Sequence, residues 1–338
     1  MRAIILAVYA AFLTAALHAE EKPLQIFVID VEGGQATLFV PPHGQSLLID
    51  TGWGYNAFRD ANRIAAAAKL AKIKKIDYML ITHYHSDHVG GVPQLVQKIP
   101  VGAFIDHGPN REESKTSSTL YKEYEDATAG SPHIVAKPGD HLPVKGLDIT
   151  VVSADGKVLD APLAGGGQPN PACASVKKKD PDPSENARSL GVFIRFGDFR
   201  VADLGDLTWN KELELVCPAN KLGKADLFVV SHHGLDQSNS PALVHALAPR
   251  VAIMDNGAKK GGSPAAWDVV KSSPGLIDLW QLHFANEGGS AHNATDPFIA
   301  NTTEADTGFY LKVTAKKDGS FEVYNARNKV TRQYGPGR

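Results

Sequence analysis

Four side chains that commonly bind metal ions lie within six positions of one another, in the stretch THYHSDHVGG at residues 82–91. They are His83, His85, Asp87 and His88. Neutral imidazoles and carboxylates are the ligands that hold Zn²⁺ and similar divalent cations. In a tight turn after a strand, we expect His83 and His85 to bind one metal and Asp87 and His88 to bind a second. Two metals about 3.5–4 Å apart lower the pKa of a bridging water and stabilise the oxygens of a displacement, so the spacing predicts one half of a two-metal hydrolytic site.

The sequence around this stretch predicts the elements that must position it. Residues 77–82 have the apolar pattern of a buried strand, and Gly90-Gly91 supply a flexible turn before a helical segment at 92–98. The four side chains therefore lie where a strand ends.

Further ligands are expected at strand ends later in the chain. Asp206 follows one predicted strand, and the pair His232-His233 follows another. A carboxylate can bridge two cations, and a further imidazole can complete a shell. Asp203 remains an alternative to Asp206. We favour His232 as the ligand because it lies nearer the strand end, and we expect His233 to line the pocket.

Strands and helices alternate over the rest of the chain, with hairpins at the start of each half. This pattern predicts an α/β fold with a mixed sheet covered by helices. The predicted strands are 24–31, 36–40, 46–50, 78–82, 103–106, 147–152, 191–196, 199–204, 227–231, 251–254, 277–282, 308–313 and 321–325, and the predicted helices are 57–72, 92–98, 118–129, 210–216, 241–247 and 264–271.

Residues 154–188 form the least regular segment, rich in Gly, Pro, Lys and Asp. Loops of this length are usually functional or poorly ordered, and we expect this one to lie over the rim of the active site rather than to be a disordered surface excursion. Cys173 lies within it and Cys217 ends a helical segment. As the only two cysteines in the sequence, they are predicted to form a disulfide that ties the loop to the body.

Composition and the N-terminal residues indicate where the chain works. Residues 1–19 have the outline of a secretory signal peptide, with an uncleaved anchor as the alternative. We therefore expect a single hydrolase domain over 20–338. We expect it to work in the periplasm or outside the cell, without a stable membrane anchor. The formal net charge is −2, from 35 basic and 37 acidic residues, and it gives no strong signal for nucleic-acid binding. The pair Lys259-Lys260 is interpreted as solvated loop charge.

In their order along the chain, these motifs resemble those of metallo-β-lactamase-fold hydrolases. An Asp-Thr-Gly at Asp50 comes first, followed by the His-x-His-x-Asp-His stretch, a Gly-Asp at Asp206 and a strand-terminal histidine. Three details resemble the hydrolase domain attached to competence DNA-uptake channels and the related phosphorylcholine esterases. These details are VIDVEGGQ at 28–35, NARS at 186–189 and SHHG at 231–234.

The resemblance implies a four-layer αββα sandwich of two facing mixed sheets, with the site along one edge. It also implies two Zn²⁺ ions, with Mn²⁺ or Fe²⁺ as alternatives. His83 and His85 would hold the first metal, Asp87 and His88 the second, with Asp206 between them. Asp50 would orient ligands from outside the metal shells.

The chain departs from the resembled pattern at two places. Many of these hydrolases carry a third histidine on the first metal, and the candidates here are His107, His133 and His141, of which we rank His107 first because it ends a predicted strand. Competence-type domains tend to carry a His-Pro pair where this chain has Ser263-Pro264. His283 and His292 are then the candidates to refill the pocket.

The mechanism that these residues imply is attack by a metal-bound hydroxide on a phosphoester or phosphodiester. Asp87 or Asp206 would accept the proton of the water, and His233 or His283 would hydrogen-bond the substrate or protonate the leaving group. Two alternatives stay open. One is a lactonase or β-lactamase-type hydrolase of cyclic amides or esters, and the other is a non-catalytic binding protein stabilised by metal.

Overall fold

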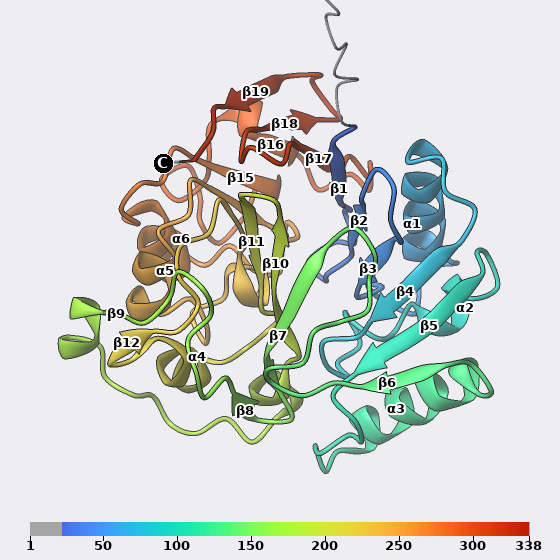
Figure 1. Cartoon of the computed structure of the whole chain (residues 1–338). Coiled ribbons are helices and arrows are strands. Elements are labelled where there is room, and N and C mark those ends of the chain that lie inside the picture. Colours follow the sequence, from blue (N-terminus) through green and yellow to red (C-terminus); the bar gives the residue numbers. More distant parts are fainter. Residues whose placement is uncertain (1–21, 338) are drawn as a thin grey trace, which may run out of the picture.

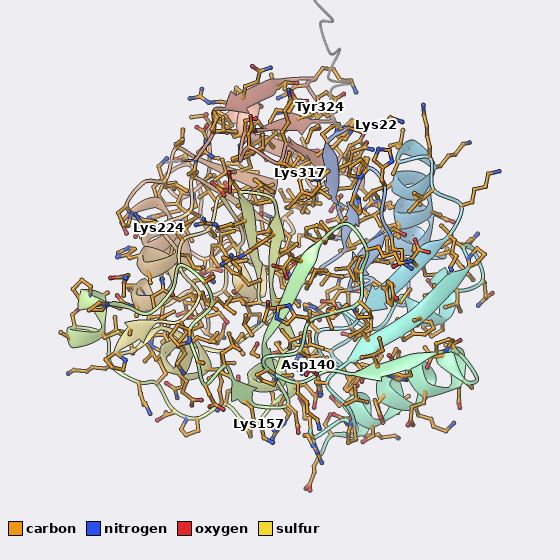
Figure 2. The ribbon with its side chains drawn as sticks, viewed as in Figure 1. Lys22, Asp140, Lys157, Lys224, Lys317 and Tyr324 are labelled. Atoms are coloured by element: carbon orange, nitrogen blue, oxygen red, sulfur yellow. A yellow bond between two sulfur atoms is a disulfide. The ribbon has the colours of Figure 1, made fainter. Side chains whose placement is uncertain are left out.

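Two large β-sheets lie face to face in the computed structural model, which describes residues 22–337 (Figure 1). The predicted signal peptide at 1–19 lies outside the described residues. Side chains from both sheets fill the space between them, whereas Lys157 and Lys224 lie exposed at the periphery (Figure 2).

Within residues 22–337, nine strands form the first sheet. Its central strands β3, β4 and β5 are parallel, and the strands on the β1 side are antiparallel. In spatial order they are β19 (Thr331–Tyr334), β18 (Phe321–Asn325), β17 (Leu311–Ala315), β1 (Leu24–Val28), β2 (Thr37–Val40), β3 (Leu47–Ile49), β4 (Ile76–Leu80), β5 (Val101–Asp106) and β6 (His133–Val135).

The second sheet has eight strands over the same described range. Parallel pairing joins β11, β13, β14, β15 and β16, and antiparallel pairing joins β7, β8, β10 and β11. In spatial order they are β16 (Ile299–Asn301), β15 (Asp278–His283), β14 (Val251–Met254), β13 (Leu227–Val229), β11 (Phe199–Asp203), β10 (Gly191–Phe196), β7 (Asp148–Ala154) and β8 (Lys157–Val158).

Helices cover the outer face of each sheet. On the first sheet they are α1 (Arg59–Leu70), α2 (Val92–Leu95) and α3 (Lys115–Thr128), and on the second they are α4 (Trp209–Val216), α5 (Pro241–Leu247) and α6 (Pro264–Lys271) (Figure 1). One apolar core lies between the sheets, and one lies between each sheet and its helices. The predicted αββα sandwich is therefore confirmed.

The apolar spacing of the sequence explains these layers. In α1, Ala61, Ile64, Ala67 and Ala68 are buried, which places one face of the helix on the first sheet. Strand β7 is buried at every position after Asp148 because it lies between the central core and the α4 side.

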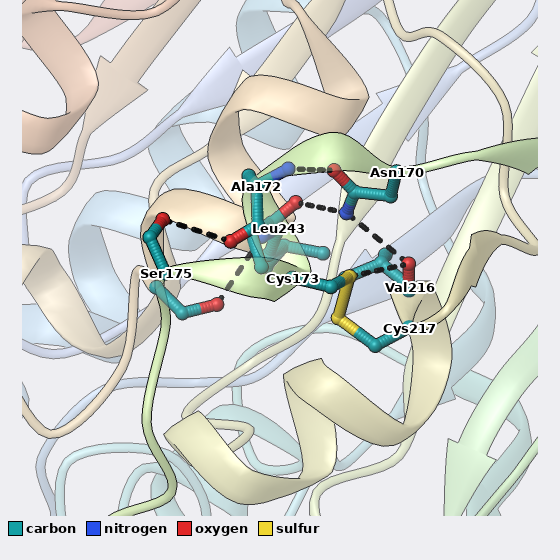
Figure 3. Close-up of a disulfide and its surroundings, with 9 residues drawn as sticks. Asn170, Ala172, Cys173, Ser175, Val216, Cys217 and Leu243 are labelled. Atoms are coloured by element: carbon teal, nitrogen blue, oxygen red, sulfur yellow. Dashed lines mark hydrogen bonds between the residues drawn. A yellow bond between two sulfur atoms is a disulfide. The ribbon is translucent and has the colours of Figure 1, made fainter.

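The segment 154–188 is more ordered than its composition suggests. It contains β8, a strand β9 (Gln168–Pro169) that pairs with β12 (Ala219–Asn220), and a short helical turn at Glu185–Arg188. The predicted disulfide between Cys173 and Cys217 is confirmed, and the side-chain amide of Asn170 donates to the carbonyl of Val216 beside it (Figure 3). The middle of the segment is thus held against α4 and α5, and its last residues approach the site.

No helix within residues 22–337 is long and apolar enough to cross a membrane.

Candidate functional site

The predicted site residues come together because parallel strands of both sheets end at the same edge of the sandwich. His83 follows β4, Asp206 follows β11, and His233 follows β13. The backbone N–H of Leu190 donates to the carbonyl of Thr82 and so joins the two sheets at this edge. Ligands far apart in sequence therefore meet at one place.

Close backbone approach, rather than flexibility, explains two glycines around the site. A Cβ on Gly91 would lie 2.2 Å from the carbonyl oxygen of Thr51, and Gly205 has a φ of +55° with its Cα facing Thr82. Gly90-Gly91 form the predicted turn before α2, and Gly91 also lets the 83–88 loop pack against residue 51.

Asp87, His88, Asp206 and His233 form one buried group whose donor atoms all lie within 4.8 Å of one another. His88 Nε2 lies 3.3 Å from Asp87 Oδ2, 3.3 Å from Asp206 Oδ2 and 3.2 Å from His233 Nε2. His233 Nε2 lies 3.1 Å from Asp87 Oδ2. Two imidazoles and two carboxylates that converge in this way are a suitable set of ligands for a divalent cation.

His83 and His232 also face the carboxylate of Asp206. The Nε2 atoms of His83 and His232 lie 3.8 Å and 3.4 Å from Asp206 Oδ2. The His83 and His85 rings are 4.6 Å apart between centroids. Asp206 is thus the carboxylate around which the imidazoles of both motifs gather, and its bridging role stays a prediction.

Neighbouring oxygens hold the rear nitrogens of His88 and His83. Asp50 Oδ2 accepts from His88 Nδ1 at 2.7 Å, and the same oxygen accepts from the Thr82 hydroxyl. Because that hydroxyl donates to Asp50, its oxygen is left to accept from His83 Nδ1 at 3.0 Å. Such contacts fix the tautomer of a ligating histidine and leave its other nitrogen free for a metal.

His85 has an equivalent partner. Glu112 Oε2 accepts from His85 Nε2 at 2.9 Å, which leaves Nδ1 of His85 as its available ligand atom. Behind His233, the carboxylate of Asp255 lies 3.4 Å from Nδ1 as a charge contact and not as a hydrogen bond. Both carboxylates come from loops that sequence patterns do not connect to the histidine motif.

Unpartnered buried atoms test whether a cation fits this site. Among residues 22–337, His83 Nε2 and Asp206 Oδ1 are buried atoms without a hydrogen-bond partner. Buried polar atoms are nearly always satisfied, and a bound ion is one of the recognised reasons for an exception. Both atoms belong to residues that face the group, so the donor set fits a metal centre.

The electrostatics of the group support the same assignment. Burial acts to raise the pKa of Asp206, but the charges of His232, His88 and His233 outweigh it and hold that pKa well below its usual range. Burial, followed by the neighbouring charges of His88 and His85, lowers the pKa of His83 well below its usual value. Ionised carboxylates and neutral imidazoles are the forms that bind metals.

His88 behaves differently. Burial acts to lower its pKa, but Asp206, Asp87 and Asp50 outweigh burial and raise that pKa well above the usual value. His88 must therefore give up a proton when it binds a metal.

The positions of the two side chains of the histidine pair differ from the sequence prediction. His233 joins Asp87, His88 and Asp206 in the converging group, although the sequence favoured His232 as the ligand and His233 as a residue that lines the pocket. Both histidines have a φ of 54°, so the backbone turns in the left-handed region and strand alternation no longer predicts side-chain direction. His232 still lies beside Asp206, where it can complete the shell of His83 and His85.

The structure does not bring His107 to the group. Its Nε2 lies 2.9 Å from Glu185 Oε2, and both side chains are fully buried. A buried carboxylate requires a donor, and His107 provides one. His133 pairs with Asp106, and His141 is exposed beside Asp148, so neither replaces it.

The two histidines proposed to refill the pocket also lie elsewhere. His283 Nε2 lies 2.7 Å from Asp30 Oδ1, and the buried ring cannot reach a leaving group without breaking this contact. His292 packs edge-on against Trp267. The predicted proton-donor role of His283 is therefore not supported, because its neighbours are Asp30 and Glu32.

The structure also places at the site one cation, Lys260, that the sequence did not predict there. Lys260 forms an ion pair with Asp87 and lies over the Trp53 ring, so it is not merely solvated loop charge. The sequence feature that could have indicated this position is the following pair Gly261-Gly262, since both have positive φ and allow a sharp turn beside His233.

Comparison with known proteins matches residues 29–177 to the family model described as the metallo-beta-lactamase superfamily. An atrochrysone carboxyl ACP thioesterase of Aspergillus fumigatus is 31% identical over 120 residues, which are 33% of this chain and 28% of that protein. A lactamase-like protein of Emericella nidulans is 31% identical over 144 residues, 39% of each chain. The chain thus spans about a third of the length of the curated relatives that it matches.

Solved structures give more distant matches. Zn²⁺-bound PqqB from Methylobacterium extorquens has a TM-score of 0.37 and 14% identity, over 61% of this chain and 71% of that one. CmlA, a diiron β-hydroxylase from Streptomyces venezuelae, has a TM-score of 0.38 and 18% identity, over 69% of this chain and 44% of that one. The likeness to competence-type hydrolases and phosphorylcholine esterases stays a prediction. The two facing sheets, their helical layers and the matched residues 29–177 show that this chain has the fold of the metallo-β-lactamase superfamily.

Proposed function

We propose that this chain is a metal-dependent hydrolase that cleaves a phosphoester or phosphodiester at the edge of the sandwich. One observation carries the proposal: Asp87, His88, Asp206 and His233 converge within 4.8 Å, and His83, His85 and His232 lie beside them. Structural zinc usually needs one closed shell of four ligands, whereas more than four candidate ligands gather around Asp206.

The residues divide into two proposed shells. Asp87, His88 and His233 would hold one cation, with Asp206 shared. His83, His85 and His232 would hold the other. Zn²⁺ is the expected metal, with Mn²⁺ or Fe²⁺ as alternatives, and such cations acidify water and stabilise the negative charge of a displacement.

The protein's own groups position the reaction and move its protons. Asp50, Thr82 and Glu112 orient three imidazoles through their rear nitrogens. The carboxylates of Asp87 and Asp206 are the candidate proton acceptors.

Thioester hydrolysis is the second candidate. Curated relatives carry the name atrochrysone carboxyl ACP thioesterase, at 28–32% identity over about a third of the chain. An acyl centre and a phosphoryl centre both develop negative charge on oxygen during hydrolysis, so the same ligands serve either substrate.

A substrate panel tests the proposal. Purified protein, loaded with zinc or manganese and with its metal content measured, is assayed with a chromogenic phosphodiester, an acyl thioester, a lactone and a β-lactam. We expect phosphodiester cleavage that chelation abolishes and metal restores, with loss of at least ~100-fold in His88→Ala. The exposed His141→Ala variant is the matched control and keeps full activity. No hydrolysis of any substrate by metal-loaded protein would refute the catalytic proposal.

We further propose that the protein works in an oxidising compartment, either the periplasm or the exterior of the cell. The disulfide between Cys173 and Cys217 supports this placement, because such bonds persist mainly where thiols are not kept reduced. Fractionation of expressing cells tests it, and recovery of the protein in the cytoplasm with free thiols would contradict it.

A further inference from the structure

Lys260 lies at the mouth of the candidate metal site. It belongs to the loop between β14 and α6, and its ammonium forms an ion pair with Asp87, one of the converging carboxylates. The side chain is 31% exposed, whereas that of Asp87 is 8% exposed. Lys260 therefore connects the buried group with solvent.

Aromatic side chains fix the direction of Lys260. Its Nζ lies 4.9 Å from the centre of the Trp53 ring, and Trp53 lies 5.2 Å from the Tyr55 ring. The backbone N–H of Trp53 donates to the buried carboxylate of Asp60, which anchors this turn. An ammonium held over an aromatic face in this way is directed, unlike a freely rotating surface lysine.

The neighbouring Lys259 provides a contrast on the same loop. Its side chain is 76% exposed, and its ammonium pairs with Glu304 on the surface, 2.8 Å away. Of these two adjacent lysines, only Lys260 contacts the site.

We propose that Lys260, supported by Trp53, forms a subsite that binds the negatively charged group of the substrate beside the bond that is cleaved. This inference rests on the proposed hydrolase function and adds to it the residue that binds the anionic oxygen of the substrate. A carboxylate that ligates a metal shares its charge with that metal, so the attraction between Asp87 and Lys260 weakens and the ammonium becomes available to an anion. Lysine presents three N–H donors and one positive charge, which suit a phosphate or carboxylate oxygen.

A cavity beside the motif provides room for the rest of such a substrate. It has a volume of about 800 Å³ and is lined by Tyr55 and Ser86 together with residues of α2 and α3. Ser86 lies next to Asp87 in the chain, and Tyr55 lies next to the Trp53 ring. Lys260 itself does not line this cavity, so the cavity offers room beside the motif and is not part of the anion subsite.

The test compares Lys260→Gln with Lys259→Gln. Loss of a hydrogen bond to a charged group corresponds to roughly a 10–100-fold change, so we expect the KM for an anionic phosphodiester to rise by at least ~10-fold in Lys260→Gln. Hydrolysis of a neutral lactone or ester should change less than ~2-fold, and Lys260→Arg should restore most of the binding because the charge is kept.

A binding measurement gives a readout independent of turnover. Calorimetric titration of stoichiometrically zinc-loaded protein with inorganic phosphate should show affinity weakened by at least ~10-fold in Lys260→Gln and unchanged in Lys259→Gln. Equal phosphate affinity in both variants, or no phosphate binding by the unsubstituted protein, would overturn the subsite. Loss of zinc from Lys260→Gln would also overturn it, since Lys260 would then act on the metal shell. These failures differ from failure of the hydrolase proposal, in which the unsubstituted metal-loaded protein cleaves nothing.

Discussion

Replacement of Asp50 by Asn tests whether the carboxylate behind His88 contributes to metal binding. Asp50 is fully buried, its Oδ1 accepts from the backbone N–H of Thr82 at 2.8 Å, and its Oδ2 accepts from the Thr82 hydroxyl and from His88 Nδ1. Asn keeps one oxygen but loses the charge and one acceptor. It also tolerates the φ of 58° at this position, which makes it a gentler change than Ala.

The expected magnitude follows from these contacts. Loss of a carboxylate partner behind a ligating histidine typically weakens metal binding by about 10–100-fold, which is about 1.4–2.8 kcal/mol. A hydrogen bond to a charged group contributes about 1.5–3 kcal/mol, in agreement with that range. We therefore expect zinc affinity to fall by one to two orders of magnitude in Asp50→Asn.

The assay is competition for zinc with a chromogenic chelator, alongside circular dichroism to confirm folding. Asp77→Asn is the matched control, because Asp77 also accepts from a backbone N–H and a hydroxyl, those of Ser46, but contacts no histidine. Asp77→Asn should lose some stability and keep its zinc affinity. If Asp50→Asn and Asp77→Asn bind zinc within about twofold of each other, the reasoning about His88 is wrong.

Three further predictions concern His85, the disulfide and a buried carboxyl group. In Glu112→Gln, His85 loses a charged partner, so we expect zinc to bind about 10-fold more weakly in a chelator competition assay, with little change in the unfolding midpoint. An unchanged zinc affinity would show that Glu112 does not orient His85. Replacing Cys173 and Cys217 by Ser removes a cross-link between positions 44 residues apart, so the free energy of unfolding in urea should fall by about 4 kcal/mol, and a change below about 1 kcal/mol would mean that the disulfide constrains the unfolded chain little. Burial raises the pKa of Glu212 from 4.5 to about 7 against its backbone hydrogen bonds, so the folded state holds the proton more tightly than the unfolded state. The protonated Glu212 therefore contributes about 3 kcal/mol to the free energy of unfolding; this contribution is complete below pH 4.5 and is lost as the pH rises through 7. Glu212→Gln should remove this decrease of the unfolding free energy with pH, measured between pH 4.5 and 8. An identical pH dependence in both proteins would contradict the assignment.

Local periodicity predicted most of the fold. The helix at 57–72 corresponds to α1, the helix at 210–216 corresponds to α4, and the strand at 251–254 coincides with β14. Edge strands were missed: β6 and β19 are mostly exposed and lack a continuous apolar pattern. Their positions depend on hydrogen bonding to a neighbouring strand, which a single segment does not reveal.

Residue types and their spacing were enough to predict the metal-binding chemistry and a mixed sheet covered by helices, while the αββα arrangement came from the resemblance to metallo-β-lactamase-fold hydrolases. Four ligand residues in six positions, followed by Asp206 and a histidine pair at later strand ends, indicated a metal-binding edge. These statements depend on residue type, spacing and periodicity, which are properties of the chain alone.

Only the tertiary structure decided which side chains meet. It placed His233 in the group with Asp87, paired His107 with Glu185, and brought Glu112 and Lys260 to the site from separate loops. Left-handed backbone angles and contacts between distant loops set these directions, and neither leaves a periodic trace in the sequence.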